Sequence, residues 1–358
     1  PFKDICSMQI NTPHYGEVLL NFEGDIFETE DQRNWSDASF KTYCTPLGNP
    51  FPAQVVEGQP IKQKITFKLL QLPQIDSNSL KNKQSETSKK PFSVKIGLGL
   101  SDKAQELTAF QVEKLKLLNL NHLRIDIKLF SAGWESVLTN ALRQSAQLHT
   151  KLELALHFGD SINEQLDNFL VFNGLEDDKI EKIIVYIYRK HGWTNDFYEN
   201  VVLKIKQKYP SVAIGGGTDA NFAELNRAEI NAEQYDFLSY AVNPQVHAFD
   251  DTSVIETIEA YGDMIKTAKK KAANKPICIS PITLKQRFNP VATDAENTPP
   301  LADARQKTVF LAEWTQKCLD EINKHGLDSA TLFETVGERG VMDNDLFPVY
   351  HVLLNRAK

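Results

Sequence analysis

The sequence predicts a (β/α)₈ TIM barrel, preceded by an antiparallel β domain that we expect to be truncated. Three observations support this prediction. Between residues 92 and 358, apolar runs typical of strands alternate with segments of helical periodicity. Eight such runs fit within this stretch, which agrees with the strand number and the size of a TIM barrel. A doubly wound open sheet is the alternative, but no GxGxxG turn follows the first strand.

The first 75 residues predict antiparallel β structure. Short alternating stretches occur in GEVLLNFEGDIFET (16–29) and QKITFKLLQL (63–72), and Gly, Pro and Asn interrupt them. Residues 76–91 are rich in Ser, Asn and Lys without an apolar period, which predicts a linker or a long surface loop. The chain begins at Pro1 and its first residues resemble the middle of a domain. We therefore expect part of this domain to be missing.

The barrel domain is expected to span residues 92–358, and each strand precedes a helical pattern or a loop. The strand candidates lie at residues 93–100, 122–130, 152–158, 182–188, 212–218, 237–247, 277–284 and 330–335. The clearest helical patterns lie at residues 106–119, 196–210, 253–272 and 305–326.

Two of the strand candidates alternate apolar residues with charged ones. In HLRIDIKL (122–129), Arg124 and Asp126 share one face, and in LELALHF (152–158) His157 shares a face with Glu153. One face of a barrel strand meets the helices, so the charged face points into the interior. Burying such groups without partners costs several kcal/mol each. We expect them to be cross-bonded or to reach a solvated cavity at one barrel mouth; a purely structural network is the alternative.

The segment IGGGTDANFAELNR (214–227) is the most unusual local sequence. Its three glycines permit a close backbone approach or a positive φ. A tight turn with a helix cap at Thr218 or Asp219 is the simplest interpretation, and a phosphate-binding loop is disfavoured because its lysine is absent. Glu224 and Asn226 exceed what a turn requires, so we predict that Thr218, Glu224 and Asn226 belong to the site.

Two further strand-end groups are candidates. NPQVHAFDD (243–251) places Asn243, Gln245 and His247 on one predicted strand face, which favours substrate binding. Glu334 ends the last strand, where barrel enzymes carry catalytic groups, although an ion pair with Arg339 or Arg287 would also explain it.

The amino-terminal segment at residues 30–47 mixes charged and amide side chains with aromatic ones. Arg33, Asn34 and Asp37 surround Trp35 and Phe40 in this segment. Such a mixture is suited to holding sugar hydroxyls, and it would equally suit a network at a domain interface.

Composition excludes several functions. The net charge of −7 and the pI of about 5.7 argue against a nucleic-acid partner. No run approaches the roughly 18 apolar residues that span a membrane. The cysteines (Cys6, Cys44, Cys278 and Cys318) are scattered, which predicts free thiols and a cytoplasmic location.

Known catalytic motifs are absent as well. The sequence has no GxSxG, HExxH or HxH, so a Ser or Cys nucleophile is unsupported. Asp126, His157, Glu224 and His247 are an alternative ligand set for a divalent ion, but their spacing is not diagnostic. We predict no metal and no cofactor.

Several segments resemble the D-apionate lactonase family. They are EDQRNWSDASFKTYCTPL (30–47), GGGTDANFAELNR (215–227), NPQVHAFDD (243–251), SPITLKQRFNP (280–290), FETVGERGVMD (333–343) and FPVYHVLL (347–354). The resemblance covers nearly the whole chain in the same order. It implies a β domain followed by a TIM barrel, and hydrolysis of the lactone of a branched aldonic acid in carbohydrate catabolism.

These observations lead to a hypothesis of metal-independent hydrolysis of a five-membered sugar lactone. Glu334 or Glu224 would act as general base on water, and His247 or Arg124 would stabilise the oxyanion. The predicted substrate-binding residues are Arg124, Asp126, His157, Thr218, Asn226, Asn243, Gln245, Arg33, Asn34 and Asp37. The alternatives are a glycoside hydrolase using Glu224 and Glu334, and a non-catalytic carbohydrate-binding barrel. The expected partner is a small carbohydrate or sugar lactone, and the oligomeric state stays open.

Overall fold

The computed structural model describes residues 2–12, 16–35, 39–50, 52–72, 92–101, 106–188, 197–287 and 302–357. The chain forms two compact units. One consists of Pro1–Arg33 with Ser39–Lys90, and the other of Asn34–Ala38 with Pro91–Lys358. The predicted linker at 76–91 and the candidate Asp37 lie outside the described residues.

The amino-terminal unit contains two three-stranded antiparallel sheets, so the prediction of antiparallel β structure is confirmed. One sheet has the order β1-β4-β5, with β1 (Phe2–Ile5), β4 (Phe27–Asp31) and β5 (Phe40–Tyr43). The other has the order β2-β3-β6, with β2 (Ser7–Thr12), β3 (Gly16–Glu23) and β6 (Lys64–Gln71). A short 3₁₀ turn, Gln32–Trp35, follows β4.

The second unit is a closed barrel of eight parallel strands, which confirms the predicted fold class. Its order is β10-β11-β12-β13-β14-β7-β8-β9. The strands are β7 (Lys95–Gly99), β8 (His122–Lys128), β9 (Lys151–Phe158), β10 (Ile180–Ile187), β11 (Ala213–Gly217), β12 (Phe237–Val242), β13 (Ile277–Ile282) and β14 (Ser329–Glu334).

Strand β12 is shorter than predicted. It ends at Val242, and residues 243–247 form an irregular, bent segment. Pro244 has no N–H for the ladder, and the Asn243 side chain accepts a hydrogen bond from the Gln245 N–H at 3.2 Å. The prediction that Asn243, Gln245 and His247 share one strand face is therefore wrong.

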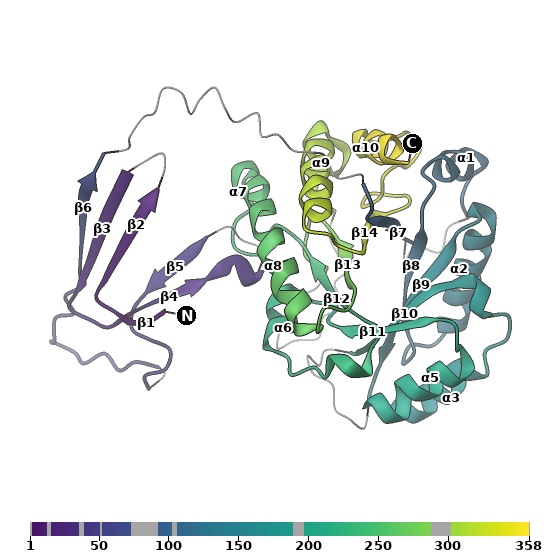
Figure 1. Cartoon of the computed structure of the whole chain (residues 1–358), viewed down its shortest axis with the longest axis horizontal. Coiled ribbons are helices and arrows are strands. Elements are labelled where there is room, and N and C mark those ends of the chain that lie inside the picture. The colour runs from purple at the N-terminus through teal and green to yellow at the C-terminus, as the bar shows by residue number, and fades with distance from the viewer. Residues whose placement is uncertain are drawn as a thin grey trace. The chain divides into compact units, whose positions relative to one another are not determined.

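Helices surround the barrel strands (Figure 1). They are α1 (Ala109–Leu117), α2 (Trp134–Leu148), α3 (Ile162–Leu170), α5 (Leu203–Lys208), α6 (Phe222–Arg227), α7 (Asp251–Glu256), α8 (Ile258–Lys271), α9 (Val309–Lys324) and α10 (Pro348–Arg356). Among the helices in the described part of the chain, none combines the length and apolarity needed to cross a membrane.

The alternation predicted for β8 and β9 is confirmed. The apolar set, including Leu123 and Leu154, is buried in the main core with the residues of the helices. Arg124, Glu153 and His157 are also buried, at 1%, 0% and 4% exposure, on the opposite face. The barrel interior is therefore largely polar, and its few apolar side chains form a separate small cluster of Ala155, Ile184, Tyr186, Phe237 and Cys278.

The glycines of β11 are required by close packing, as predicted. A Cβ at Gly217, whose φ is +141°, would lie 1.8 Å from the Ser239 carbonyl oxygen. A Cβ at Gly215 would lie 2.2 Å from the Phe237 ring. The four cysteines are free thiols, as expected.

Candidate active site at the carboxyl mouth of the barrel

A sealed ionic network fills the amino-terminal half of the barrel interior, and we call it the floor network. Glu153 lies at its centre. Its Oε2 is 3.3 Å from Lys182 Nζ and 3.4 Å from His122 Nε2, and its Oε1 accepts hydrogen bonds from Thr331 (3.2 Å) and Ser280. All five side chains are buried. They come from strands β8, β9, β10, β13 and β14, so the network joins the strands across the barrel.

The electrostatics of the floor network are those of a closed, compensated site. Burial opposes ionisation of Glu153, but interaction with His122, Lys182 and Arg124 lowers its pKa to about 2. Burial lowers the pKa of His122 to about 3, because Glu153 offsets this effect only in part. At neutral pH the network therefore holds a carboxylate, an ammonium and a neutral imidazole.

A second polar group, which we call the mouth cluster, lies at the carboxyl ends of the strands. It consists of Arg124 and Asp126 on β8, His157 on β9, Asp219 after β11, and Arg287 after β13. Arg124 Nη2 lies 2.6 Å from Asp126 Oδ1 and 3.0 Å from Asp219 Oδ1. Arg287 bridges the same two carboxylates, at 2.7 Å from Asp126 Oδ2 and 2.5 Å from Asp219 Oδ1.

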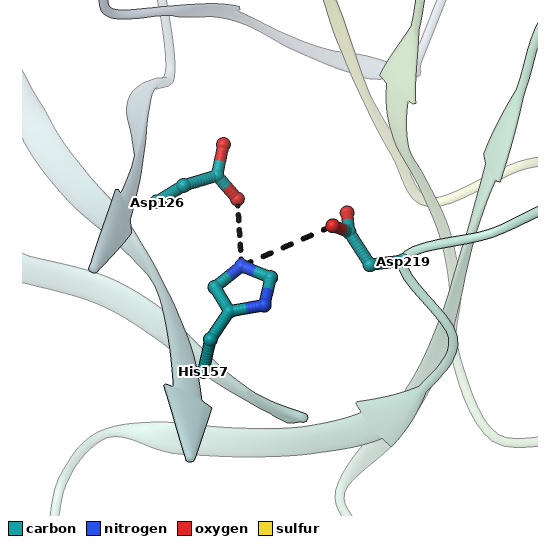
Figure 2. Close-up of side chains that lie close together, drawn as sticks. All are labelled: Asp126, His157 and Asp219. Carbon is teal, nitrogen blue, oxygen red and sulfur yellow. Dashed lines mark hydrogen bonds and ion pairs between the residues drawn. The ribbon is translucent and has the colours of Figure 1, made fainter. Parts of the chain in front are cut away.

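The two aspartates approach the imidazole of His157 from separate elements (Figure 2). His157 Nε2 lies 3.0 Å from Asp126 Oδ1 and 3.9 Å from Asp219 Oδ2. Burial opposes ionisation of Asp126, but Arg124, Arg287 and His157 hold the pKa of this carboxyl well below its usual range. With two guanidinium groups and two carboxylates, the cluster is charge-balanced.

Exposure divides the mouth cluster into reachable and unreachable groups. The side chains of Asp126, Arg287 and Asp219 are 30%, 21% and 13% exposed, whereas that of Arg124 is only 1% exposed. Arg124 also donates hydrogen bonds from Nη1 to the Ser280 carbonyl at 2.8 Å and hydroxyl at 3.0 Å. It therefore ties the mouth cluster to the floor network and is itself out of reach of solvent.

A hollow adjoins the mouth cluster between the ends of β11, β12 and β13. Asp219 and Arg287 belong to its lining, and Asn243 donates a hydrogen bond to the Asn221 side chain at 3.0 Å on another side. The full lining is Asp219, Ala220, Asn221, Ala241, Val242, Asn243, Thr283, Gln286 and Arg287. The lining mixes carboxylate, amide and guanidinium groups with small apolar residues, and the cavity volume of about 10 Å³ has room for a single water molecule.

Three groups of the mouth cluster could also hold a metal ion. Ligand atoms of Asp126, His157 and Asp219 lie within 4.8 Å of one another. Oxygen and imidazole ligands are acceptable to several divalent ions. However, both carboxylates are already paired with Arg124 and Arg287. An added cation would have to displace a guanidinium group, so these residues fit a metal poorly.

Asp219 and Arg287 are the site residues that the sequence interpretation missed. The expected helix cap at Thr218 or Asp219 is wrong, because Asn221 is the residue that precedes α6. Thr218 closes the turn instead, since its Oγ1 accepts a hydrogen bond from the Ala220 N–H at 3.0 Å. This turn leaves the Asp219 carboxylate directed at the barrel interior. Charged residues in loops directly after strands of a barrel are the signal that would have found both.

Gln245 is part of the loop structure around the hollow. It is buried, and its Nε2 donates to the Leu284 carbonyl at 2.6 Å and to Asp303 at 2.8 Å. These bonds connect the loop after β12 with the segments before and after residues 288–301.

Other predicted residues gather around Trp35, which belongs to the barrel unit. Asn226 donates to the Asn34 side chain at 3.0 Å, the Arg227 guanidinium lies 4.8 Å from the Trp35 ring, and the His247 ring lies 5.9 Å from it. We call these residues the outer group.

Glu224 and Arg33, two further predicted site residues, belong neither to the mouth cluster nor to the lining of the hollow. The Glu224 side chain is 4% exposed, and its Oε1 is 3.8 Å from Nη1 of Arg227, so it belongs beside the outer group. Arg33 belongs to the amino-terminal unit, where it pairs with Asp31 at 2.8 Å.

Glu334 ends β14 and forms an ion pair with Arg339, one of the two partners that the sequence analysis considered for it. Its Oε1 lies 2.8 Å from Arg339 Nε and 2.6 Å from Nη2. The Glu334 side chain is 19% exposed. The carboxylate is therefore both held in place and accessible.

Two solved structures share the fold. A family 39 glycoside hydrolase from Bacteroides cellulosilyticus WH2 superposes with a TM-score of 0.54 at 8% identity, covering 83% of this chain and 67% of that one. An arabinofuranosidase gives a TM-score of 0.52 at 11% identity, covering 74% of this chain and 70% of the other. At these identities the similarity concerns the fold alone.

Sequence comparison is more specific. Residues 1–71 match the D-apionate lactonase N-terminal domain, and residues 96–358 match the D-apionate lactonase TIM barrel domain. The D-apionate lactonase of Brucella anthropi is 27% identical over 371 residues, a match that covers 95% of this chain and 59% of the relative's length. Because the two domain matches together take in most of its residues, this chain belongs to the D-apionate lactonase family.

Proposed function

We propose that this chain hydrolyses the ester bond of a sugar-acid lactone of the D-apionolactone type. The observation that carries the proposal is the partly exposed mouth cluster at the carboxyl ends of the barrel strands, in a chain of this family. The described cluster balances its own charges, so it suits an uncharged polyhydroxylated ring. The free thiols are compatible with a cytoplasmic location, which we also propose.

Glu334 would act as the general base, as the sequence suggested. It would take a proton from water while the water oxygen attacks the lactone carbonyl carbon, and the electron pair would move to the carbonyl oxygen. When the intermediate collapses, the bond to the ring oxygen breaks. The proton on Glu334 then passes to that oxygen, which releases an open hydroxy acid.

Arg287 is the proposed donor to the oxyanion, in place of His247 or Arg124. The Arg287 side chain is 21% exposed and the residue lines the hollow, whereas the Arg124 side chain is 1% exposed and His247 contacts Trp35. Two carboxylates fix its orientation before substrate binds, which is the preorganisation that oxyanion stabilisation requires. Asp126, Asp219 and Asn243 would accept or donate hydrogen bonds to substrate hydroxyls, and Arg124 and His157 would position the aspartates.

Glycoside hydrolysis finds less support in the mouth cluster. It needs one carboxyl group kept protonated near neutral pH to protonate the leaving oxygen. The surroundings of Asp126 instead lower the pKa of its carboxyl group well below its usual range, so this group is ionised near neutral pH.

The test is to follow acid release from D-apionolactone by the purified chain, with aryl glycosides as the competing substrates. We expect acid release and no glycoside cleavage. Glu334→Gln should lower kcat by about 100-fold, within the range for loss of a general base. Glu224→Gln is the matched control and should have little effect, because Glu224 lies beside the outer group. Near-wild-type turnover by Glu334→Gln would overturn the assignment of the base, and absence of lactone hydrolysis would overturn the function.

A further inference from the structure

The last barrel strand breaks its own alternation immediately before Glu334. Thr331 faces the interior, where it bonds with His122 at 2.8 Å. Strict period two would therefore direct residue 333 inward and residue 334 outward, beneath the helices. Instead, Leu332 and Phe333 both belong to the core shared with the helices, and the Phe333 ring lies 6.4 Å from that of Trp314 on α9.

One extra residue in β14 explains this change. Leu332 pairs with Leu98 on β7, but the next pair along β7 is Gly99 with Glu334. Phe333 is the inserted residue, and its φ is +47°. A left-handed backbone is unfavourable for a bulky residue, and such strain tends to be retained at functional sites. Bulges of this kind redirect the side chain that follows them.

The residue opposite the bulge is adapted to it. A Cβ at Gly97 would meet the ring of His122, which is part of the floor network, so Gly97 faces the barrel interior. Gly99 lies two residues further along β7 and therefore faces the interior as well. A Cβ at Gly99 would lie 2.7 Å from the Phe333 carbonyl oxygen, so only glycine fits. The Glu334 Cγ lies 3.8 Å from the same point, which places this side chain on the inward side.

The chain after the bulge is fastened by backbone hydrogen bonds. The Thr335 N–H donates to the Gly99 carbonyl at 2.8 Å, and the Glu334 N–H donates to the Arg339 carbonyl at 3.1 Å. With the ion pair to Arg339, the direction of the Glu334 side chain is set from several sides.

We infer that Phe333 is a positioning residue, whose left-handed backbone turns Glu334 into the barrel mouth. This inference deepens the proposed function and rests on it for the role of Glu334 in turnover. It assigns to Phe333 two separate properties, namely a backbone conformation that sets the active site and a ring that stabilises the packing against α9.

The experiment separates these two properties by comparing Phe333→Gly with Phe333→Val. Glycine adopts a positive φ freely but removes the whole ring, whereas valine keeps apolar volume and, being β-branched, strongly resists a positive φ. We expect kcat to fall by about 30-fold or more in Phe333→Val and by less than about 5-fold in Phe333→Gly, with KM changed little in either. Thermal denaturation should show the reverse order, with the glycine variant the less stable.

A purely structural role would give the same order in both measurements, with glycine worse than valine, and this result would overturn the inference. In a Glu334→Gln background, Phe333→Val should cause no further loss of kcat.

A second readout does not depend on lactonase activity, so failure of the proposed function is distinguishable from failure of the inference. Glu334→Cys is placed in a chain with Cys6→Ser and Cys44→Ser, because the other two thiols are buried. A small neutral thiol reagent should label this cysteine readily, and Phe333→Val should slow labelling by about tenfold while Phe333→Gly does not. Equal labelling in all three proteins would overturn the inference.

Discussion

The floor network and the mouth cluster are built from the same kinds of residue, but they differ in access to solvent. Glu153 is 0% exposed and lies between Lys182, His122 and Arg124, whereas Asp126 and Asp219 are 30% and 13% exposed at the mouth. Buried charges are retained only when compensated, and both groups satisfy this condition. Charge balance alone therefore does not identify a site; the additional requirement is that a ligand can reach the balanced groups.

Arg124 connects the two regions and sharpens the comparison. Nη1 donates to Ser280 on the floor side, and Nη2 contacts Asp126 and Asp219 on the mouth side. We therefore expect substitutions in the floor network to affect mainly the stability of the fold, and substitutions in the mouth cluster to affect mainly turnover.

The largest expected effect on stability comes from the floor. Glu153→Gln removes the charge that compensates Lys182 and Arg124, and it should lower the free energy of unfolding by about 3–5 kcal/mol. Urea denaturation followed by circular dichroism measures this change. The control is Glu176→Gln, which breaks an exposed pair with Lys179 at 3.5 Å and should change nothing measurable. Equal stability of the two variants would mean that the floor is not a structural network.

The largest effect on turnover is expected at the mouth. Arg287→Gln should lower kcat on D-apionolactone by about 10²–10³-fold, as found when one oxyanion donor is removed. Its effect on unfolding should be smaller than that of Glu153→Gln, because Arg287 is 21% exposed. Arg143→Gln on α2 is the matched control and should turn over normally, because this arginine pairs with Glu106 at the surface. If Arg287→Gln keeps its rate, another donor stabilises the oxyanion.

The floor also predicts a dependence of stability on pH. The pKa of His122 is lowered from 6.5 to about 3, so between these values the unfolded chain binds a proton that the folded chain does not. Stability should be complete above pH 6.5 and should fall by about 1.4 kcal/mol per pH unit below it. Glu153, with its pKa lowered from 4.5 to about 2, adds a further loss below pH 4.5.

Urea titrations between pH 7.5 and 5 measure this slope, and His122→Asn should flatten it. A wild-type protein whose stability is constant over this range would contradict the neutral state assigned to the buried imidazole.

The fold and three of the five residues of the mouth cluster could be predicted from the sequence, because both follow from local periodicity. Period two on β8 and β9 was sufficient to direct Arg124, Asp126 and His157 inward. The sequence predicts too long a strand β12, because Asn243 and Gln245 continue the alternation although Pro244 ends the ladder.

The remaining residues depend on contacts that no local pattern contains. Asp219 follows three glycines and resembles a helix cap, and Arg287 lies in a loop without periodicity. Each meets its partners only when the barrel closes. The bulge at Phe333 is equally invisible in sequence, since FET reads as ordinary alternation.

The smallest expected effect concerns metal ions, and it separates two interpretations of the mouth cluster. If Arg124 and Arg287 already compensate Asp126 and Asp219, a chelator should change kcat on D-apionolactone by less than about twofold. If the carboxylates and His157 instead hold a divalent ion, chelation should abolish turnover and Zn²⁺ or Mn²⁺ should restore it. Arg287→Gln sharpens the choice, because removing one guanidinium group leaves the two carboxylates undercompensated. We expect Co²⁺ to bind more tightly to this variant than to the wild type, because in the wild type the Arg287 guanidinium group occupies the place that a cation would take. Binding is followed by the visible absorption of Co²⁺.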